Sequence, residues 1–305
     1  MQNDAGTTAT GRIWRGQTGR AFLASLIGCE PHLFRFALQA DDTQTHALAN
    51  ELQTAAQEWL KNCDQLPDSK IFEHASQFVN SYAHGLESEW RAFDSVLLEA
   101  ELHLRAVAQE LEARAGLRWW AEPAALDAQI AFVPGGGLPE RSAALSYALS
   151  DRETAGTWWV SPAGFLVTTR GPVFGFPAVL DAAADDHWRR TDEDTVWNVD
   201  FQGPVRVFEV HGADDWAQLA KTYPSTPRDF TTFDWGSSQD EKLVLPDWRA
   251  VAQDWDGVHV SFAGYLGASY QPIALDRGQY TLLAGWHPDA TAWLTGKARL
   301  AHQLL

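Results

Sequence analysis

The stretch "LAGWHPDATAWL", residues 283–294, combines residue types that could do chemistry. It places an indole, an imidazole and a carboxylate close together, at Trp286, His287 and Asp289. An acid and an imidazole beside an aromatic ring could hold and polarise a small ligand. The same residues also suit a strand, a tight turn around Pro288 and Asp289, and an apolar run that anchors the chain. Both interpretations stay open from the sequence.

A second group of this kind lies in "DWDGVHVSF", where Asp256 and His259 are three residues apart. They could act as an acid–base pair, although Asp-Gly is first of all a turn sequence. His259 alternates with Val258 and Val260, so its side chain should point away from theirs. If the valines face the core, we expect His259 to face solvent or a cleft.

Metal and thiol chemistry have less support. His211, His259 and His287 each follow or lie within a strand-like run and could bind zinc if they converged, but their spacing does not require it. Cys29 and Cys63 form no CxxC motif and read as ordinary reduced thiols. We therefore expect no metal.

The elements that would position these residues change character near Gly116. Before it, apolar residues recur every three or four positions over 45–60 and 87–115, and residues 71–85 read as a further helix. This predicts a bundle of three or four helices, with Gly116 as a C-terminal cap.

After Gly116, short alternating runs such as "DAQIAFV", "PVRVFEV" and "GVHVSF" alternate with helical pieces such as "ADDWAQLAKTYP" and "LPDWRAVAQDW". The pattern predicts an α+β fold, with a helical domain over 1–116 and a tryptophan-rich domain over 117–305. Its sheet should be mixed or antiparallel, because the helices do not alternate regularly with parallel-type strands.

The chain has 305 residues and a formal net charge of −17. Such a protein is repelled by nucleic acid and by anionic membranes, so we expect no nucleic-acid or membrane partner. A basic protein partner or a neutral small molecule remains open. The N-terminus lacks the pattern of a secretory signal, and no apolar run is long enough to span a membrane, so we expect a cytoplasmic protein.

Three stretches together carry a resemblance: "TWWVSP", "PDWRAVAQDWDGVHVSFAGYL" and "LAGWHPDATAWL". In order and spacing they resemble a loosely defined set of actinobacterial-type proteins of uncharacterised activity, over about the last 150 residues. That pattern is in turn more weakly similar to ADP-ribosyltransferase-type NAD-binding folds. Those enzymes have an arginine or histidine on the first strand, a Ser/Thr-rich second strand and an acidic residue on a late strand.

The resemblance implies NAD as a substrate and assigns site residues by position. Asp289 would stabilise the ribosyl cation as nicotinamide leaves, and Arg118 and Ser161 would hold the ribose and phosphates. The residues expected to line the cofactor site are Trp159, Trp286, His287 and His259. The sequence departs from the family where one serine before a proline replaces the Ser/Thr-rich strand, and where Asp replaces the longer Glu.

Two further functions follow from the residues. One is a non-catalytic binding protein of the immunity or accessory type, whose acidic surface meets a basic partner. The other is an enzyme acting on a small molecule or sugar, with Trp158 or Trp159 as a platform for the ring. No nucleophile motif such as GxSxG is present.

Overall fold

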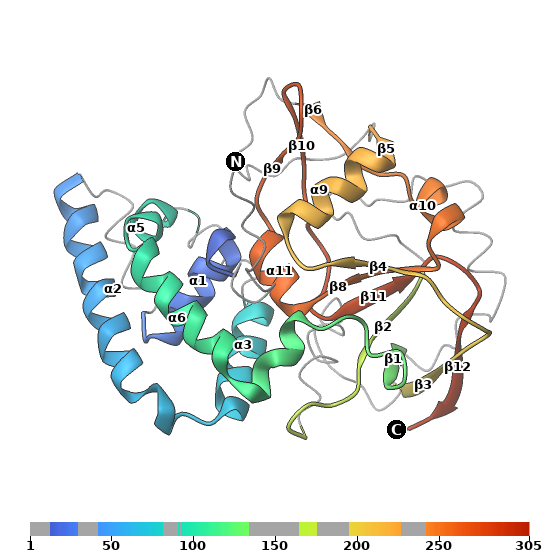
Figure 1. Ribbon diagram of the computed structural model, residues 1–305, viewed down its shortest axis with the longest axis horizontal. Coiled ribbons are helices and arrows are strands. Elements are labelled where there is room, and N and C mark those ends of the chain that lie inside the picture. The colour runs from blue at the N-terminus through green and yellow to red at the C-terminus, as the bar shows by residue number, and fades with distance from the viewer. Residues whose placement is uncertain are drawn as a thin grey trace.

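The computed structural model describes residues 13–29, 42–81, 91, 93–133, 165–175, 195–226 and 242–304. Within them, helices dominate the first part of the chain and a mixed sheet dominates the second, so the predicted α+β class is confirmed (Figure 1). No helix of the described residues is both long enough and apolar enough to cross a membrane.

Most of the helices predicted for the first part of the chain are present in the structure. Its elements are α1 (Gln17–Leu26), α2 (Asp42–Asn62), η4 (Cys63–Gln65), α3 (Asp68–Ser81), α5 (Asp94–Glu99), α6 (Glu101–Ala113) and η6 (Ala115–Ala121). The long helix expected over 87–115 is wrong as a single element. Ala100 has ψ near 5°, outside helical geometry, and separates α5 from α6.

Gly116 is not the C-terminal cap of α6, because that position is taken by Arg114. It lies in η6, three residues beyond the end of α6, and has a packing role. Its backbone N–H donates to Asp68 Oδ2 at 3.0 Å. A Cβ atom at this position would collide with the Asp68 carboxylate. The glycine thus lets η6 approach the start of α3, which places the residues that follow it against the sheet.

In the part of the chain that the structure describes, the main sheet has seven strands in the order β12-β3-β1-β2-β11-β8-β4. Of these described neighbours, β4 and β8 pair in parallel and the others pair antiparallel. Its strands are β1 (Gln129–Val133), β2 (Leu166–Arg170), β3 (Thr195–Phe201), β4 (Val207–Val210), β8 (Gly257–Val260), β11 (Ala290–Trp293) and β12 (Ala298–Gln303). The smaller sheets contain β5 (Pro224–Ser225), β6 (Lys242–Leu243), β7 (Leu245–Pro246), β9 (Ile273–Ala274) and β10 (Gln279–Thr281).

Among the described residues, three helices accompany these strands: α9 (Ala213–Thr222), α10 (Trp248–Asp254) and α11 (Phe262–Ala268). The sequence predicts α9 and α10, and the Asp247 side chain caps α10 by accepting from two backbone N–H groups. It does not predict α11. The strand expected over "GVHVSF" ends at Val260, and the Ser261 hydroxyl accepts from Gly264 N to start a helix.

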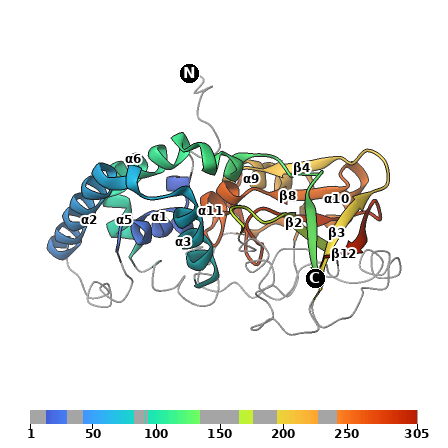
Figure 2. The same ribbon diagram turned by 90° about the horizontal axis from the view of Figure 1, so that it is seen from below.

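The two halves share one hydrophobic core. Trp120 stacks on Phe262 of α11 with ring centroids 4.6 Å apart and meets Phe22 of α1 edge-on. Thr18 of α1 donates to the backbone oxygen of Ser269, just after α11. As a result, α11 lies between the helical half and the main sheet (Figures 1 and 2). The boundary at residue 116 stays a prediction.

The four neighbouring strands β2, β11, β8 and β4 have two unlike faces. Val258, Val260, Ala290 and Ala292 belong to the main core together with residues of α9 and α11. Because side chains alternate along a strand and paired residues share a face, the opposite face carries a different set. One row of that set is polar and runs across the strands: Glu209, His259, Thr291 and Thr168. The next row on the same face is apolar and includes Val207, Trp293 and Leu166.

Candidate functional site

Four charged residues meet where β2, β4 and β8 end and β11 begins, and we call them the strand-end cluster. Arg170 is the last residue of β2, and Asp289 immediately precedes β11. Glu209 and His259 are paired, next-to-last residues of the parallel strands β4 and β8. The antiparallel pairing of β11 with β2 and β8 brings these positions to one end of the sheet.

The turn before β11 fixes the position of Asp289. Residues 288 and 289 form a turn, and Asp289 has φ of 55°, a left-handed conformation that aspartate tolerates better than most residues. Arg170 N lies 3.3 Å from Asp289 Oδ2 and donates to it. The indole N–H of Trp286 donates to Ala290 O at 3.2 Å and braces the turn from inside the core.

Both ends of the His259 ring face a carboxylate. Nδ1 lies 2.5 Å from Glu209 Oε2, and Nε2 lies 3.4 Å from Asp289 Oδ1, an ion pair without hydrogen-bond geometry. Burial by itself lowers the pKa of His259, but Asp289 and Glu209 outweigh it and raise the pKa to about 9. His259 is therefore an imidazolium at neutral pH, which makes it a charged donor and a poor general base.

The second cation is Arg170. Its Nε lies 3.1 Å and 3.2 Å from the two oxygens of Asp289. Its terminal nitrogens contact Glu122 Oε2 at 3.4 Å and Pro123 O at 3.3 Å. The guanidinium carbon lies 5.1 Å from the ring centroid of Trp119, close enough for a cation–π contact. With His259 protonated, the two cations balance Asp289 and Glu209.

The cluster also contacts the segment that leaves the helical half. Ala124 N donates to Glu209 Oε1 at 3.1 Å, so this carboxylate bridges the segment and His259. Arg170 contacts the same segment through Glu122 and Pro123. The side chains of Glu209 and Arg170 therefore hold residues 122–124 against the ends of the strands through hydrogen bonds and an ion pair.

Beyond His259 the polar face continues across the sheet. Thr291 pairs with His259 and is fully buried, and its Oγ1 and His259 Nε2 have no hydrogen-bond partner among the described residues. Thr168 is satisfied, since it accepts from Trp293 Nε1 at 2.7 Å and donates to the Gln129 side chain. Two buried polar atoms on paired residues thus lack the hydrogen bonds that such atoms normally have.

Of the residues expected from the sequence, Asp289 and His259 meet in the cluster. The expectation that His259 faces solvent or a cleft is wrong: its valine neighbours do face the core, but its own side chain is fully buried in an ion network. Trp286 is also buried, in contact with the Trp216 and Trp248 rings.

The remaining expected residues lie elsewhere. Arg118 belongs to η6 and not to a strand, and it is exposed, so the guanidinium beside Asp289 comes from Arg170 instead. His287 is half-buried just before the turn. Ser161 and Trp159 lie outside the described residues.

Two members of the cluster, Arg170 and Glu209, are not among the residues expected from the sequence. The sequence around each of these two residues has a pattern that could have indicated it. Arg170 ends a β-branched run, "LVTTR", and Glu209 alternates with the apolar residues of "VRVFEV". A charge at such a position of a predicted strand indicates either an exposed face or a buried partner, and only the strand order supplies the partner.

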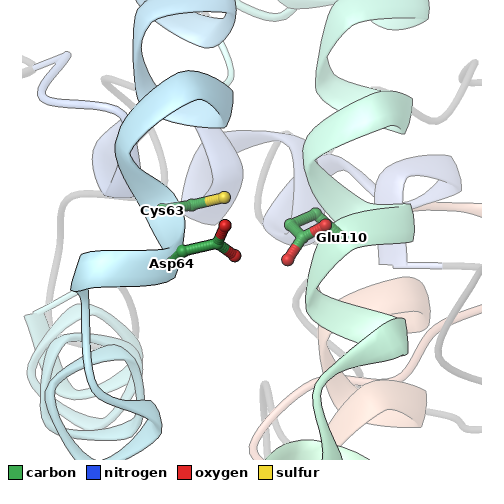
Figure 3. Close-up of side chains that lie close together, drawn as sticks. All are labelled: Cys63, Asp64 and Glu110. Carbon is green, nitrogen blue, oxygen red and sulfur yellow. The ribbon is translucent and has the colours of Figure 1, made fainter.

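A separate group, Cys63, Asp64 and Glu110, has the donor types of a metal site. The three side chains point toward one another between η4 and α6 (Figure 3), with possible ligand atoms within 4.8 Å. Arg114 already occupies this region, because its Nε lies 3.7 Å from Glu110 Oε1 and its Nη2 donates to Cys63 O. A metal ion there would be repelled by the Arg114 guanidinium, so these three residues are poorly suited to bind a metal.

Comparison of the chain with family models, with curated proteins and with solved structures gave no match.

Proposed function

We propose that the protein binds a dinucleotide of the NAD type at the strand-end cluster, as an ADP-ribosyltransferase-like protein. The observation that supports this proposal is the contact between Arg170 and Asp289 at the ends of adjacent strands. A strand-borne arginine beside an acidic residue of a late strand is the pairing that the sequence resemblance implies. Arg170 replaces Arg118 in this proposal, although it lies on β2 rather than on the first strand.

The contacts of Arg170 suggest how an anion would enter. Its link to Glu122 is long, 3.4 Å, and the Glu122 side chain is 56% exposed, so that link contributes little. A phosphate group offers a guanidinium two short charge-assisted hydrogen bonds and would displace Glu122. The ring of Trp119, already against the guanidinium, would form one wall of the site.

Cleavage of the nicotinamide–ribose bond would place a further demand on Asp289. Its carboxylate must approach the developing ribosyl cation, yet its side chain is 1% exposed and contacts both Arg170 and His259. Anion binding by Arg170 would loosen one of those contacts. In this proposal, bond cleavage requires that rearrangement and binding does not.

The burial of Asp289 favours a second candidate, a non-catalytic acidic protein that binds a basic protein partner. In that case the cluster is a structural element, and the net charge of −17 drives association. Binding would then weaken as the salt concentration rises.

The two candidates are separated by melting temperatures measured with and without millimolar NAD, together with an assay for released nicotinamide. A ligand at a hundred times its dissociation constant adds about 2.7 kcal/mol, which raises the melting temperature by several degrees. We expect Arg118→Gln to keep this shift and Arg170→Gln to lose it.

Each outcome has a definite meaning. A shift without nicotinamide release supports binding and removes catalysis. The absence of a shift in the wild type contradicts the dinucleotide proposal. The second candidate would then be tested with polylysine as a model basic partner at low and high salt.

A further inference from the structure

The part of the strand-end cluster that links the sheet to residues 122–124 has a property that does not depend on the proposed ligand. His259 is fully buried, and both carboxylates beside it come from other elements, Glu209 from β4 and Asp289 from the turn before β11. A buried charge is tolerated only when partners compensate it. The two carboxylates and the imidazolium therefore depend on one another.

Glu209 uses its two oxygens for different tasks. Oε2 bonds the His259 ring, and Oε1 accepts the N–H of Ala124, outside the sheet. If the ring loses its proton, Glu209 and Asp289 are left with one cation between them, Arg170, which contacts Asp289 and not Glu209. Glu209 then gains by turning toward water, and its bond to Ala124 weakens.

We propose that Glu209, His259 and Asp289 form a proton-controlled clasp, which holds residues 122–124 on the sheet while His259 is charged and releases them when it is neutral. The described charged groups around the ring are Glu209 and Asp289, with Arg170 and then Glu122 behind Asp289. Loss of the proton leaves the ring as a neutral donor, whose hydrogen bond to Glu209 Oε2 is weaker than that of the imidazolium. The helical half would then be less firmly attached at this point.

The direction of the pH effect follows from the raised pKa of His259. The unperturbed pKa is 6.5 and the folded value is about 9, so the stabilisation is complete below pH 6.5 and is lost as the pH rises through about 9. Over that range, the unfolding equilibrium constant should rise by about two orders of magnitude more in the wild type than in a variant without this titration.

The first test compares unfolding of the wild type and of His259→Gln from pH 6 to pH 10. We expect the excess pH dependence to disappear in His259→Gln and to remain in His302→Gln, a matched change of an exposed histidine on β12. Equal pH dependence in the wild type and His259→Gln would overturn the proposal.

A second test follows the segment itself and serves also if His259→Gln does not fold. Hydrogen exchange of peptides covering residues 117–128 should accelerate above pH 9, relative to peptides from α6 in the same molecule. Glu209→Gln should move this acceleration to lower pH, because one of the two carboxylates that hold the proton is neutral.

Glu122→Gln is the matched control, since Glu122 contacts Arg170 and not His259. It should leave the pH of release nearly unchanged. If residues 117–128 exchange in parallel with α6 at every pH, or if both glutamate variants behave alike, the clasp does not exist. Failure of NAD to bind would leave these results unaffected, so the two proposals fail separately.

Discussion

The two faces of β2, β11, β8 and β4 show two ways of filling a protein interior. One face presents valine and alanine to the core it shares with α9 and α11. The other presents a row of charged and hydroxyl groups, from the partly exposed Glu209 through the buried His259 and Thr291 to the buried Thr168. The apolar face gains stability from any well-shaped contact, whereas the charged groups of the polar row are tolerated only with their partners.

The largest expected loss of stability is at Asp289, on the polar side of the sheet. We expect Asp289→Ala to lower the free energy of unfolding by about 3–5 kcal/mol, because it leaves two cations, Arg170 and His259, without their shared buried carboxylate. Urea unfolding at pH 7 measures the loss.

Asp289→Asn separates the effect of the lost charge from that of the turn, since asparagine also tolerates the left-handed backbone at φ 55°. If the lost charge causes the destabilisation, Asn should recover only part of it. Full recovery by Asn would assign the effect to the turn instead of the ion network.

On the apolar face, Val258→Ala should cost about 2 kcal/mol, through lost burial and the cavity left behind. Its cost should be the same at pH 6 and pH 9, because no charge depends on Val258. A cost that changes with pH would mean that the two faces are coupled and would weaken the contrast between them.

The smallest expected effect has the opposite sign. Thr291 Oγ1 is buried without a hydrogen-bond partner among the described residues, so Thr291→Val should stabilise the protein by up to about 1 kcal/mol. Thr168→Val is the control: its hydroxyl is bonded to Trp293 and Gln129, so its loss should cost about 1–2 kcal/mol. If both changes destabilise equally, Thr291 has a partner such as a bound water.

The sequence predicts the elements of this site better than their contacts. Periodicity finds α2, α9 and α10, and the alternation in "GVHV" correctly separates His259 from its valine neighbours. The turn at Pro288 and Asp289 also follows from local residue types. These features depend on neighbours within a few positions along the chain, which a pattern can record.

The partners of His259 and Asp289 could not be predicted in the same way. Glu209 and His259 are brought together by a parallel pairing across 50 residues, and Arg170 reaches Asp289 from 119 residues away. No local pattern contains that strand order. For the same reason the order of residues along the chain points to Arg118, whereas the arginine beside Asp289 is Arg170.

The most direct test of the buried ion network is an NMR titration of the His259 imidazole in the intact protein, assigned by comparison with His259→Gln. The account predicts a pKa near 9 for this ring, with the imidazolium present throughout the neutral range. A pKa at or below the ordinary 6.5 would contradict it, because a neutral His259 would leave Glu209 and Asp289 without the charge that we infer holds them together.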